Sequence, residues 1–305
     1  TAEGFDVIDV LPELTRRSVD FIARRADAAR AEKPFFLYLP LASPHTPIVP
    51  TAAWRGKSGL NDYADFVMQT DAAVGEVLAA LERHDLTQDT LVIFTSDNGC
   101  SPEANFHFLL GRGHDPSAGR RGHKADVFEG GTHVPLLVRW PARIPAGHRS
   151  DAPVGLGDFM ATCAEILGVK LPENAGEDSV SFLPLLTGQA DAPQRVTLVT
   201  HSINGSFAIR QGPWKLALCP DSGGWSYPRP GHHATTGAPR LQLFNLERDP
   251  VELQNVVAQH PEIVRGLVAR LRAIVEQGRS TPGAPQPNAP APRWPQIDWN
   301  DLLAP

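Results

Sequence analysis

The sequence has few cysteines and no long hydrophobic run, and both absences narrow the class of protein. Its 305 residues include only three cysteines, Cys100, Cys163 and Cys219, without C-x-x-C spacing. A disulfide framework and a cysteine-based zinc site are therefore excluded. No apolar stretch approaches the roughly 20 residues that a helix needs to cross a bilayer, so we expect no membrane span.

An excess of positive charge is also missing. The formal net charge is -6 and the pI is about 6.0. Binding to a phosphate backbone needs a clustered basic surface, so nucleic acid is not expected as the main partner. The first residues, TAEGFDVIDV, lack the basic and then apolar pattern of a signal peptide. The length suffices for one large core and a smaller unit.

The first half of the chain alternates between strand and helix patterns. Helices are predicted over about 12–30 and about 62–84, where apolar residues recur on one face. Three apolar runs, in KPFFLYLPLAS, DTLVIFTSDNG and HVPLLVRWP, have the length of strands that are buried on both faces. The fold class indicated is α/β with a mostly parallel sheet.

The second half has a different pattern. After a helix that Gly168 closes, four short strand candidates separated by Gly and Pro turns predict an antiparallel sheet. A helix from Pro261 to just before Gly278 is expected to pack on it. The predicted domains are therefore 1–195, 196–279 and a proline-rich tail or strap over 280–305.

Polar loops follow two of the buried strands, at the edge where ligands of parallel sheets bind. His45 lies between two prolines after the first run, and Asp97 and Asn98 follow the second. Lys124 lies in a glycine-rich loop before the third. Each has an ordinary alternative: a structural histidine, a plain Asp-Asn-Gly turn and a solvated lysine.

Taken together, the motifs resemble those of the formylglycine-dependent sulfatases of the alkaline-phosphatase-like superfamily. The matching stretches are FFLYLPLASPHTPIVP, DTLVIFTSDNGCSP, RGHKADVFEGGTHVPLLVRWP, Phe159 to Gly168 and FAIRQGPWKL. The resemblance implies a sulfuric ester hydrolase whose chain here holds the second half of the α/β sulfatase core and a smaller C-terminal unit.

The resemblance also implies roles for individual residues. Asp97 and Asn98 would be two ligands of Ca²⁺, or less favourably Mg²⁺, because both ions take oxygen ligands. His45 would give a hydrogen bond or a proton to the leaving oxygen of the ester. Lys124 would bind the sulfate oxygens, since an ammonium stabilises charge on the transferring group.

The nucleophile of the family is a formylglycine made in a C-x-P-x-R motif, and that motif is absent here. Cys100 and Pro102 match it, but Ala104 stands in place of the arginine, so Cys100 is interpreted as a decoy. We expect a partial chain whose formylglycine belongs to a missing N-terminal portion, rather than a short inactive relative. The 305 residues alone are expected to be inactive.

Few features of the sequence indicate the substrate. The resemblance favours a sulfated carbohydrate over a simple aryl sulfate, and a periplasmic or secreted location. His201 is a candidate for contact with the leaving group, with a structural histidine as the alternative. Residues 219–237, CPDSGGWSYPRPGHHATTG, have the composition of a lid, of a binding loop or of a disordered segment. A phosphodiesterase or phosphonate hydrolase of the same superfamily, and a non-catalytic carbohydrate-binding relative, stay open as alternatives.

Overall fold

The structure is a computed structural model that describes residues 4–189, 195–288 and 297. The chain forms two compact units. Unit 1 contains the residues up to Ile93 with 101–116 and 137–144, and unit 2 contains 94–100, 117–136 and the chain from Pro145 onward. None of the helices in these described ranges is long and apolar enough to span a bilayer. The domains predicted at 1–195, 196–279 and 280–305 stay a proposal.

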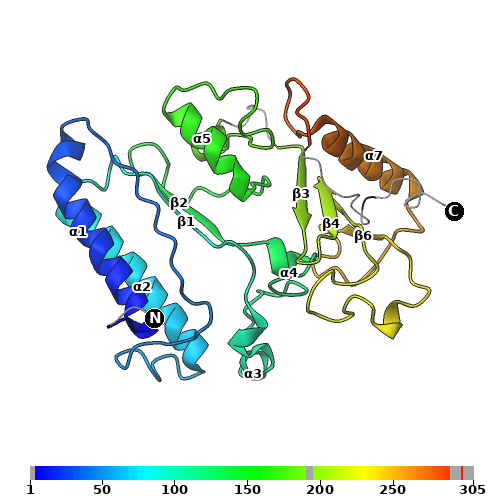
Figure 1. Ribbon diagram of the computed structural model, residues 1–305, viewed down its shortest axis with the longest axis horizontal. Helices are drawn as coiled ribbons and strands as arrows, with labels where there is room; N and C mark the ends of the chain where they lie inside the picture. The colour runs from blue at the N-terminus through cyan, green and yellow to red at the C-terminus, as the bar shows by residue number, and fades with distance from the viewer. Residues whose placement is uncertain (1–3, 190–194, 289–296, 298–305) are drawn as a thin grey trace. The chain divides into compact units, whose positions relative to one another are not determined.

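Unit 1 is built on two long helices that lie side by side (Figure 1). They are α1 (Val10–Arg30) and α2 (Asp62–Arg83), and the sequence prediction of both is confirmed. Asn61 caps α2, because its side chain accepts the N–H of Ala64 at 3.0 Å. The shared core contains Ile22, Ala26, Ala80, Leu81 and Leu86. Three short elements complete the unit: η1 (Val7–Asp9), η2 (Pro102–Ala104) and α3 (Phe106–Gly111).

The strand predicted from FFLYLPL is wrong, because residues 33–42 carry no strand assignment. Their side chains still alternate: Phe35 and Leu37 pack against the helices, whereas Phe36 and Tyr38 are 80% and 76% exposed. The segment is therefore extended, with one side packed against the helices and the other side exposed. A strand also needs a neighbouring backbone to pair with, and the described part of the chain provides none here.

The other two apolar runs form the predicted strands. They are β1 (Val92–Thr95) and β2 (Leu136–Arg139), which pair in a two-stranded sheet. The expectation that both are buried on both faces is wrong, since Phe94 is 36% exposed and Leu137 is 64% exposed.

Unit 2 contains the predicted antiparallel sheet, in the order β3-β4-β5-β6. Its strands are β3 (Thr197–His201), β4 (Phe207–Gln211), β5 (Trp214–Ala217) and β6 (Gln242–Asn245). In the register Arg210 pairs with Lys215, and Lys215 pairs with Phe244, so these three side chains share one face. The neighbouring residues of each strand point to the opposite face.

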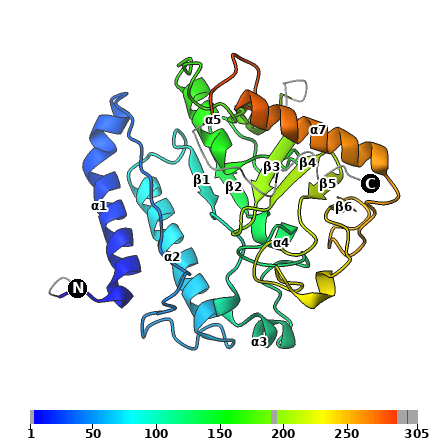
Figure 2. The same ribbon diagram turned by 45° about the vertical axis from the view of Figure 1, so that its right-hand side comes forward.

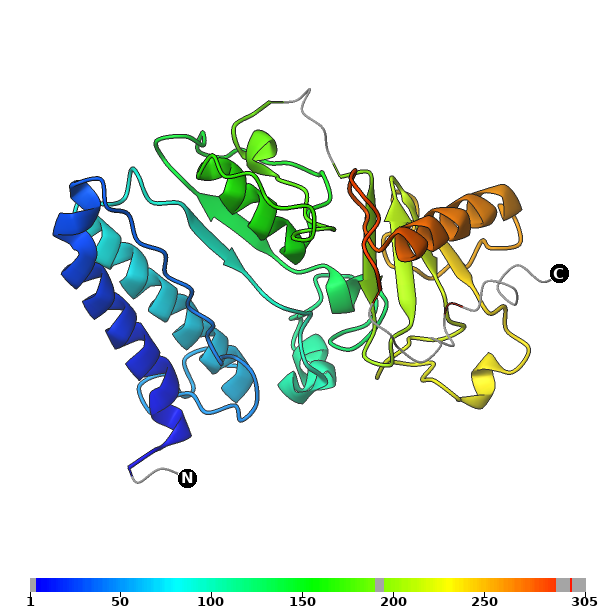
Figure 3. The ribbon, with the colours of Figure 1, turned by 45° about the horizontal axis from the view of Figure 1, so that its top comes forward.

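Helix α7 (Pro261–Gln277) packs on one face of this sheet, as predicted (Figures 2 and 3). It ends at Gly278, whose φ of 62° lies in the left-handed region that glycine adopts without strain. The apolar core between helix and sheet contains Ile209, Leu216, Leu243, Val264, Leu267, Val268 and Leu271. We call this face of the sheet the apolar face.

The opposite face of the sheet packs against the segment that links Lys124 to β2. Val127 and Phe128 are fully buried there against Ala208, Ala217 and Phe244. The one-turn helix α4 (Glu129–Thr132) follows directly. Because Lys215 lies on this face as well, we call it the charged face.

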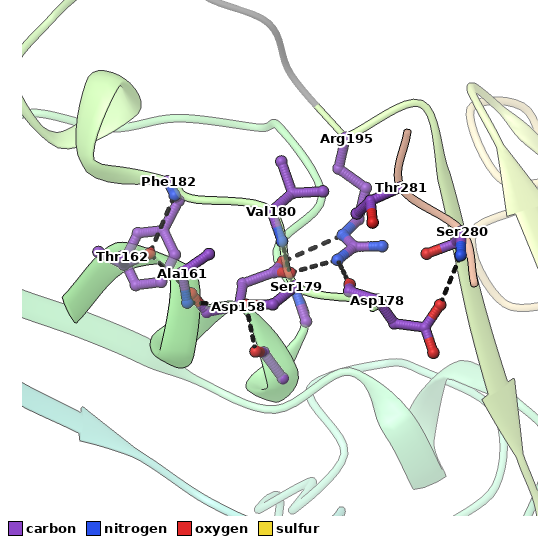
Figure 4. Close-up of polar contacts among 12 residues, drawn as sticks. Asp158, Ala161, Thr162, Asp178, Ser179, Val180, Phe182, Arg195, Ser280 and Thr281 are labelled. Atoms are coloured by element: carbon purple, nitrogen blue, oxygen red, sulfur yellow. Dashed lines mark hydrogen bonds and ion pairs between the residues drawn. The ribbon is translucent and has the colours of Figure 1, made fainter. Parts of the chain in front are cut away.

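A buried ion pair joins α5 (Phe159–Ile166) to the start of β3 (Figure 4). Arg195 Nε donates to Asp158 Oδ2 at 3.0 Å, and the Asp158 carboxylate also accepts the N–H of Val180. Residues 280–288 form a strap on the same region, since the N–H of Ser280 donates to Asp178 Oδ1 at 2.8 Å. The remaining elements of unit 2 are η3 (Leu156–Asp158), α6 (Leu183–Leu186) and η4 (His233–Thr235).

Candidate functional site

Asp97 and Asn98 form a polar turn directly after β1, within unit 2. The Asp97 carboxylate is exposed and has no hydrogen bond or ion pair to any residue that the structure describes. Asn98 donates its Nδ2 to Gly99 O at 3.0 Å, which leaves its Oδ1 free to accept. Two unengaged oxygen ligands on adjacent residues suit a hard cation such as Ca²⁺.

The described residues do not complete a metal site. Over 4–189, 195–288 and 297, no group of three or more His, Cys, Asp or Glu side chains is arranged to hold a metal ion. A calcium ion takes about six to eight oxygens, so Asp97 and Asn98 fit as part of a ligand set.

The turn that carries Lys124 lies against the turn of Asp97 and Asn98. The N–H of Lys124 donates to Cys100 O at 2.8 Å. Its ammonium is partly exposed and has no ion pair or hydrogen bond within the described ranges. The ammonium is therefore available to an anionic ligand, and the backbone bond ties it to the candidate metal turn.

Two glycines, Gly99 and Gly130, allow this close approach. Gly99 donates its N–H to Gly131 O at 2.9 Å, and a Cβ on Gly99 would lie 1.8 Å from Gly130 O. A Cβ on Gly130 would lie 2.2 Å from Gly122 O. No side chain fits at either position, so α4 is the contact surface that sets the separation of the two turns.

A buried charged network holds α4 on the charged face of the sheet. Lys215 Nζ lies 2.9 Å from Glu129 Oε1 and 2.9 Å from Glu252 Oε1. Glu252 Oε2 also accepts the N–H of Glu129 at 2.6 Å, and His133 Nδ1 lies 2.9 Å from Glu129 Oε2. Lys215, Glu129 and Glu252 are each at least nine-tenths buried. They join the first residue of α4 to β5 and to the segment after β6.

The two carboxylates of this network differ in their pKa. Burial would raise the pKa of Glu129, but the hydrogen bonds from His133 and Lys215 outweigh it, so the pKa lies well below its usual range. Burial raises the pKa of Glu252, and the Lys215 ammonium offsets that only in part. The network therefore favours the ionised form of Glu129 more strongly than that of Glu252.

The Lys215 network was not predicted from the sequence. Its one signal was a lysine at an inward-facing position of the apolar run WKLALC, where a charge needs a buried partner. The partner could not be identified from the sequence, because Glu129 lies 86 residues away.

The other predicted residues occupy separate segments. His201 ends β3 and is exposed, with Nδ1 2.9 Å from Ser202 O. The turn after it reaches the Lys124 turn, since the N–H of Ile203 donates to Ala125 O at 2.9 Å. His45 belongs to unit 1, where its Nδ1 lies 2.8 Å from Thr46 O. The catalytic, binding and metal roles of His45, Lys124, His201, Asp97 and Asn98 stay predictions.

The chain is similar in sequence to known proteins. The family profile described as Sulfatase matches residues 12–169. The chain is 35% identical over 269 residues to an N-acetylgalactosamine-6-O-sulfatase of Bacteroides thetaiotaomicron, across 87% of this chain and 51% of that protein. It is 33% identical to arylsulfatase A of Homo sapiens, across 84% of this chain and 52% of that one. The chain therefore spans about half the length of the curated relatives it matches.

Two solved structures share this fold. A Bacteroides thetaiotaomicron protein from work on glycosaminoglycan metabolism superposes with a TM-score of 0.77 and 34% identity, covering 88% of this chain and 55% of that one. A sulfatase from Pseudoalteromonas sp. gives a TM-score of 0.72 at 23% identity, covering 90% of this chain and 55% of that one.

Proposed function

Because this chain belongs to the sulfatase family, we propose that the protein hydrolyses the sulfate ester of a sulfated carbohydrate. Its fold is the alkaline-phosphatase-like α/β fold of the sulfatases to which it is similar, as the motifs predicted. The observation that carries the proposal is the bond from Lys124 N–H to Cys100 O at 2.8 Å, which joins the backbone of the Lys124 turn to the turn that carries Asp97 and Asn98.

Asp97 and Asn98 are proposed as two ligands of a calcium ion, with the remaining ligands outside the described residues. When bound, a divalent cation supplies Lewis-acid stabilisation of charge on the ester oxygens. The two side chains hold that position from a turn whose backbone Gly131 fixes through Gly99. The family implies a divalent metal together with a formylglycine; the choice of calcium is our proposal.

Lys124 is proposed to bind the sulfate oxygens. Because its backbone is anchored at Cys100 and its ammonium has no partner in the described chain, little reorganisation is needed when an anion arrives. An ammonium near the ester oxygens stabilises the negative charge that develops on them in the transition state. His45 is proposed to protonate the departing sugar oxygen, a step that prevents expulsion of a bare alkoxide.

Cys100 is not proposed as the nucleophile. Ala104 occupies the place of the arginine in the C-x-P-x-R motif. Formylglycine, when present, supplies the nucleophilic oxygen of the family reaction, and its site is proposed to lie in a part of the protein beyond this chain.

For the substrate we propose N-acetylgalactosamine 6-O-sulfate or a related sulfated sugar. The support is the relative from Bacteroides thetaiotaomicron, whose name states that specificity. A periplasmic or secreted enzyme would meet such sugars, and we propose that location.

The test is a substitution of Lys124 in the complete enzyme. Lys124→Ala is expected to lower kcat/KM for the sulfated sugar at least about a hundredfold, as expected when one transition-state donor is lost. Lys170 is the matched control, since it is exposed in the same unit and forms no ion pair with the described residues. Lys170→Ala should change kcat/KM less than about twofold.

Near-normal turnover by Lys124→Ala would contradict the proposal. A comparison of matched sulfate and phosphate esters on the same preparation identifies the reaction class. Faster hydrolysis of the phosphate ester would instead favour the phosphoryl-transfer alternative.

A further inference from the structure

Residues 221–228, which we call the aromatic loop, display two large rings beside the Lys124 turn. Trp225 is 37% exposed and Tyr227 is 65% exposed. Neither the indole N–H nor the phenol oxygen has a hydrogen-bond partner among the residues that the structure describes. Tyr and Trp combine a large apolar ring with one polar group, and both residues are enriched where proteins bind ligands or partners.

The Asp126 carboxylate fastens this loop to the Lys124 turn. The N–H groups of Trp225 and Ser226 donate to Asp126 Oδ1 at 2.8 and 3.0 Å. The other oxygen, Oδ2, accepts the N–H of His123 at 2.9 Å. The Asp126 side chain is fully buried, so water does not compete for these bonds. The backbone of Trp225 is thereby fixed to a residue only two positions from Lys124.

The contact is also sterically tight. A Cβ on Gly224 would lie 2.4 Å from Ala125 O, so glycine is required for the loop to approach this closely. The N–H of Val127 donates to Ser222 O at 2.8 Å. Within the loop, Ser222 donates its hydroxyl to Ser226 O at 2.8 Å and its N–H to Pro228 O at 2.9 Å. The rings therefore stand on a rigid support.

We propose that Trp225 and Tyr227 form the binding surface for the sugar ring of the substrate and determine its selectivity. A sulfated sugar has two chemically distinct parts: an anionic sulfate and a ring with an apolar C–H face. Lys124 offers a cation to the first part, and the aromatic rings offer apolar area to the second. The inference rests on the proposed function.

The loop adds one charge to this surface. Arg229 Nε donates to the backbone carbonyl of Trp225 at 2.7 Å, which holds an exposed guanidinium on this loop. The Tyr227 ring lies edge-on to the His232 imidazole with 4.9 Å between centroids. Both neighbours are polar, so the surface suits an amphipathic sugar better than a lipid or an apolar peptide.

The closing experiment uses Trp225→Ala in the complete enzyme. The loop is anchored through the backbone N–H of Trp225, so alanine removes the ring and keeps the anchor. KM for the sulfated sugar is expected to rise about tenfold, with kcat within about threefold, as for loss of one ring contact. Competitive inhibition by inorganic sulfate should stay unchanged, because Lys124 is intact. Trp225→Phe should recover most of the lost affinity.

Direct binding separates this inference from the proposed function. Calorimetry with neutral sugars, including N-acetylgalactosamine, should show binding to the wild-type enzyme that Trp225→Ala weakens at least about fivefold. A KM within twofold of wild type, sulfate inhibition lost in parallel, or no ring-dependent sugar binding would each overturn the inference. Failure of the wild-type enzyme to release sulfate would overturn the proposed function alone, since sugar binding is measured without turnover.

Discussion

The two faces of the β3–β6 sheet differ in what they bury. The apolar face buries Ile209, Leu216 and Leu243 under α7. The charged face buries Lys215 between Glu129 and Glu252 and carries α4, on which the Asp97 and Lys124 turns rest. One alternating strand pattern therefore serves two purposes: the first face supplies stability, and the second positions the candidate active site. Substitutions on each face test that division.

The largest effect is expected on the charged face. Lys215→Met keeps the length of the side chain but leaves two buried carboxylates facing each other. Breaking a buried ion pair in this way costs about 4 kcal/mol of unfolding free energy. Urea unfolding of the complete enzyme measures it, and kcat of the folded protein should fall as well, because α4 supports the Lys124 turn.

The control on that face is Lys215→Arg, which keeps the charge and should lose less stability. A double-mutant cycle with Glu252→Gln gives the coupling between the two side chains. A normal kcat in Lys215→Met would contradict the idea that the charged face positions the candidate active site. That face would then contribute to stability alone.

A smaller effect is expected on the apolar face. Leu216 is fully buried beside Lys215 and points to the opposite side. Leu216→Ala should lower the unfolding free energy by about 3 kcal/mol through lost burial and a residual cavity. At a temperature where the variant stays folded, kcat and KM should match wild type. A selective loss of kcat would show that the two faces are not independent.

The dependence of stability on pH should follow Glu129. A carboxyl whose pKa falls on folding contributes stability that is present above its unfolded value, about 4.3, and is lost as the pH falls toward its folded value. The raised pKa of Glu252 acts with the opposite sign, so a variant is needed to separate them. Glu129→Gln should remove a slope of at most about 1.4 kcal/mol per pH unit on acidification.

Urea unfolding at several values between about pH 5 and about pH 3 measures that slope. Identical slopes for wild type and Glu129→Gln would mean that Glu129 is not held ionised by Lys215. Ionisation of Glu129 would then not contribute to the stability of the charged face.

The long periodic elements could be predicted from the sequence. Helices α1, α2 and α7 repeat apolar residues over at least 17 positions, and such patterns leave little ambiguity. The four strands of the second sheet were readable because turns separate them. The failure at FFLYLPL has a different cause. Phe36 and Tyr38 carry a strand pattern, but strand assignment requires a pairing partner that local sequence does not specify.

The candidate site could be predicted only in part. His45, Asp97, Asn98 and Lys124 were proposed because they follow apolar runs or glycines in recognisable motifs, and their roles stay predictions. What supports them was not found, since Asp126 and Trp225 are 99 residues apart and meet only through tertiary structure. Polar groups that act on a distant backbone leave no local pattern.

The smallest expected effect is a gain in stability on the apolar side. Gly266 lies exposed in the interior of α7, and a Cβ there would meet no atom within 4 Å. Gly266→Ala should raise the unfolding free energy by about 0.5–1 kcal/mol, because alanine loses less backbone entropy on forming a helix. Thermal unfolding of the complete enzyme measures this gain, and kcat/KM should stay constant. In the described part of the chain α7 packs on the apolar face of the sheet, so a change in kcat/KM would show that the helix influences the site through the sheet. A loss of stability would contradict the open space around Gly266.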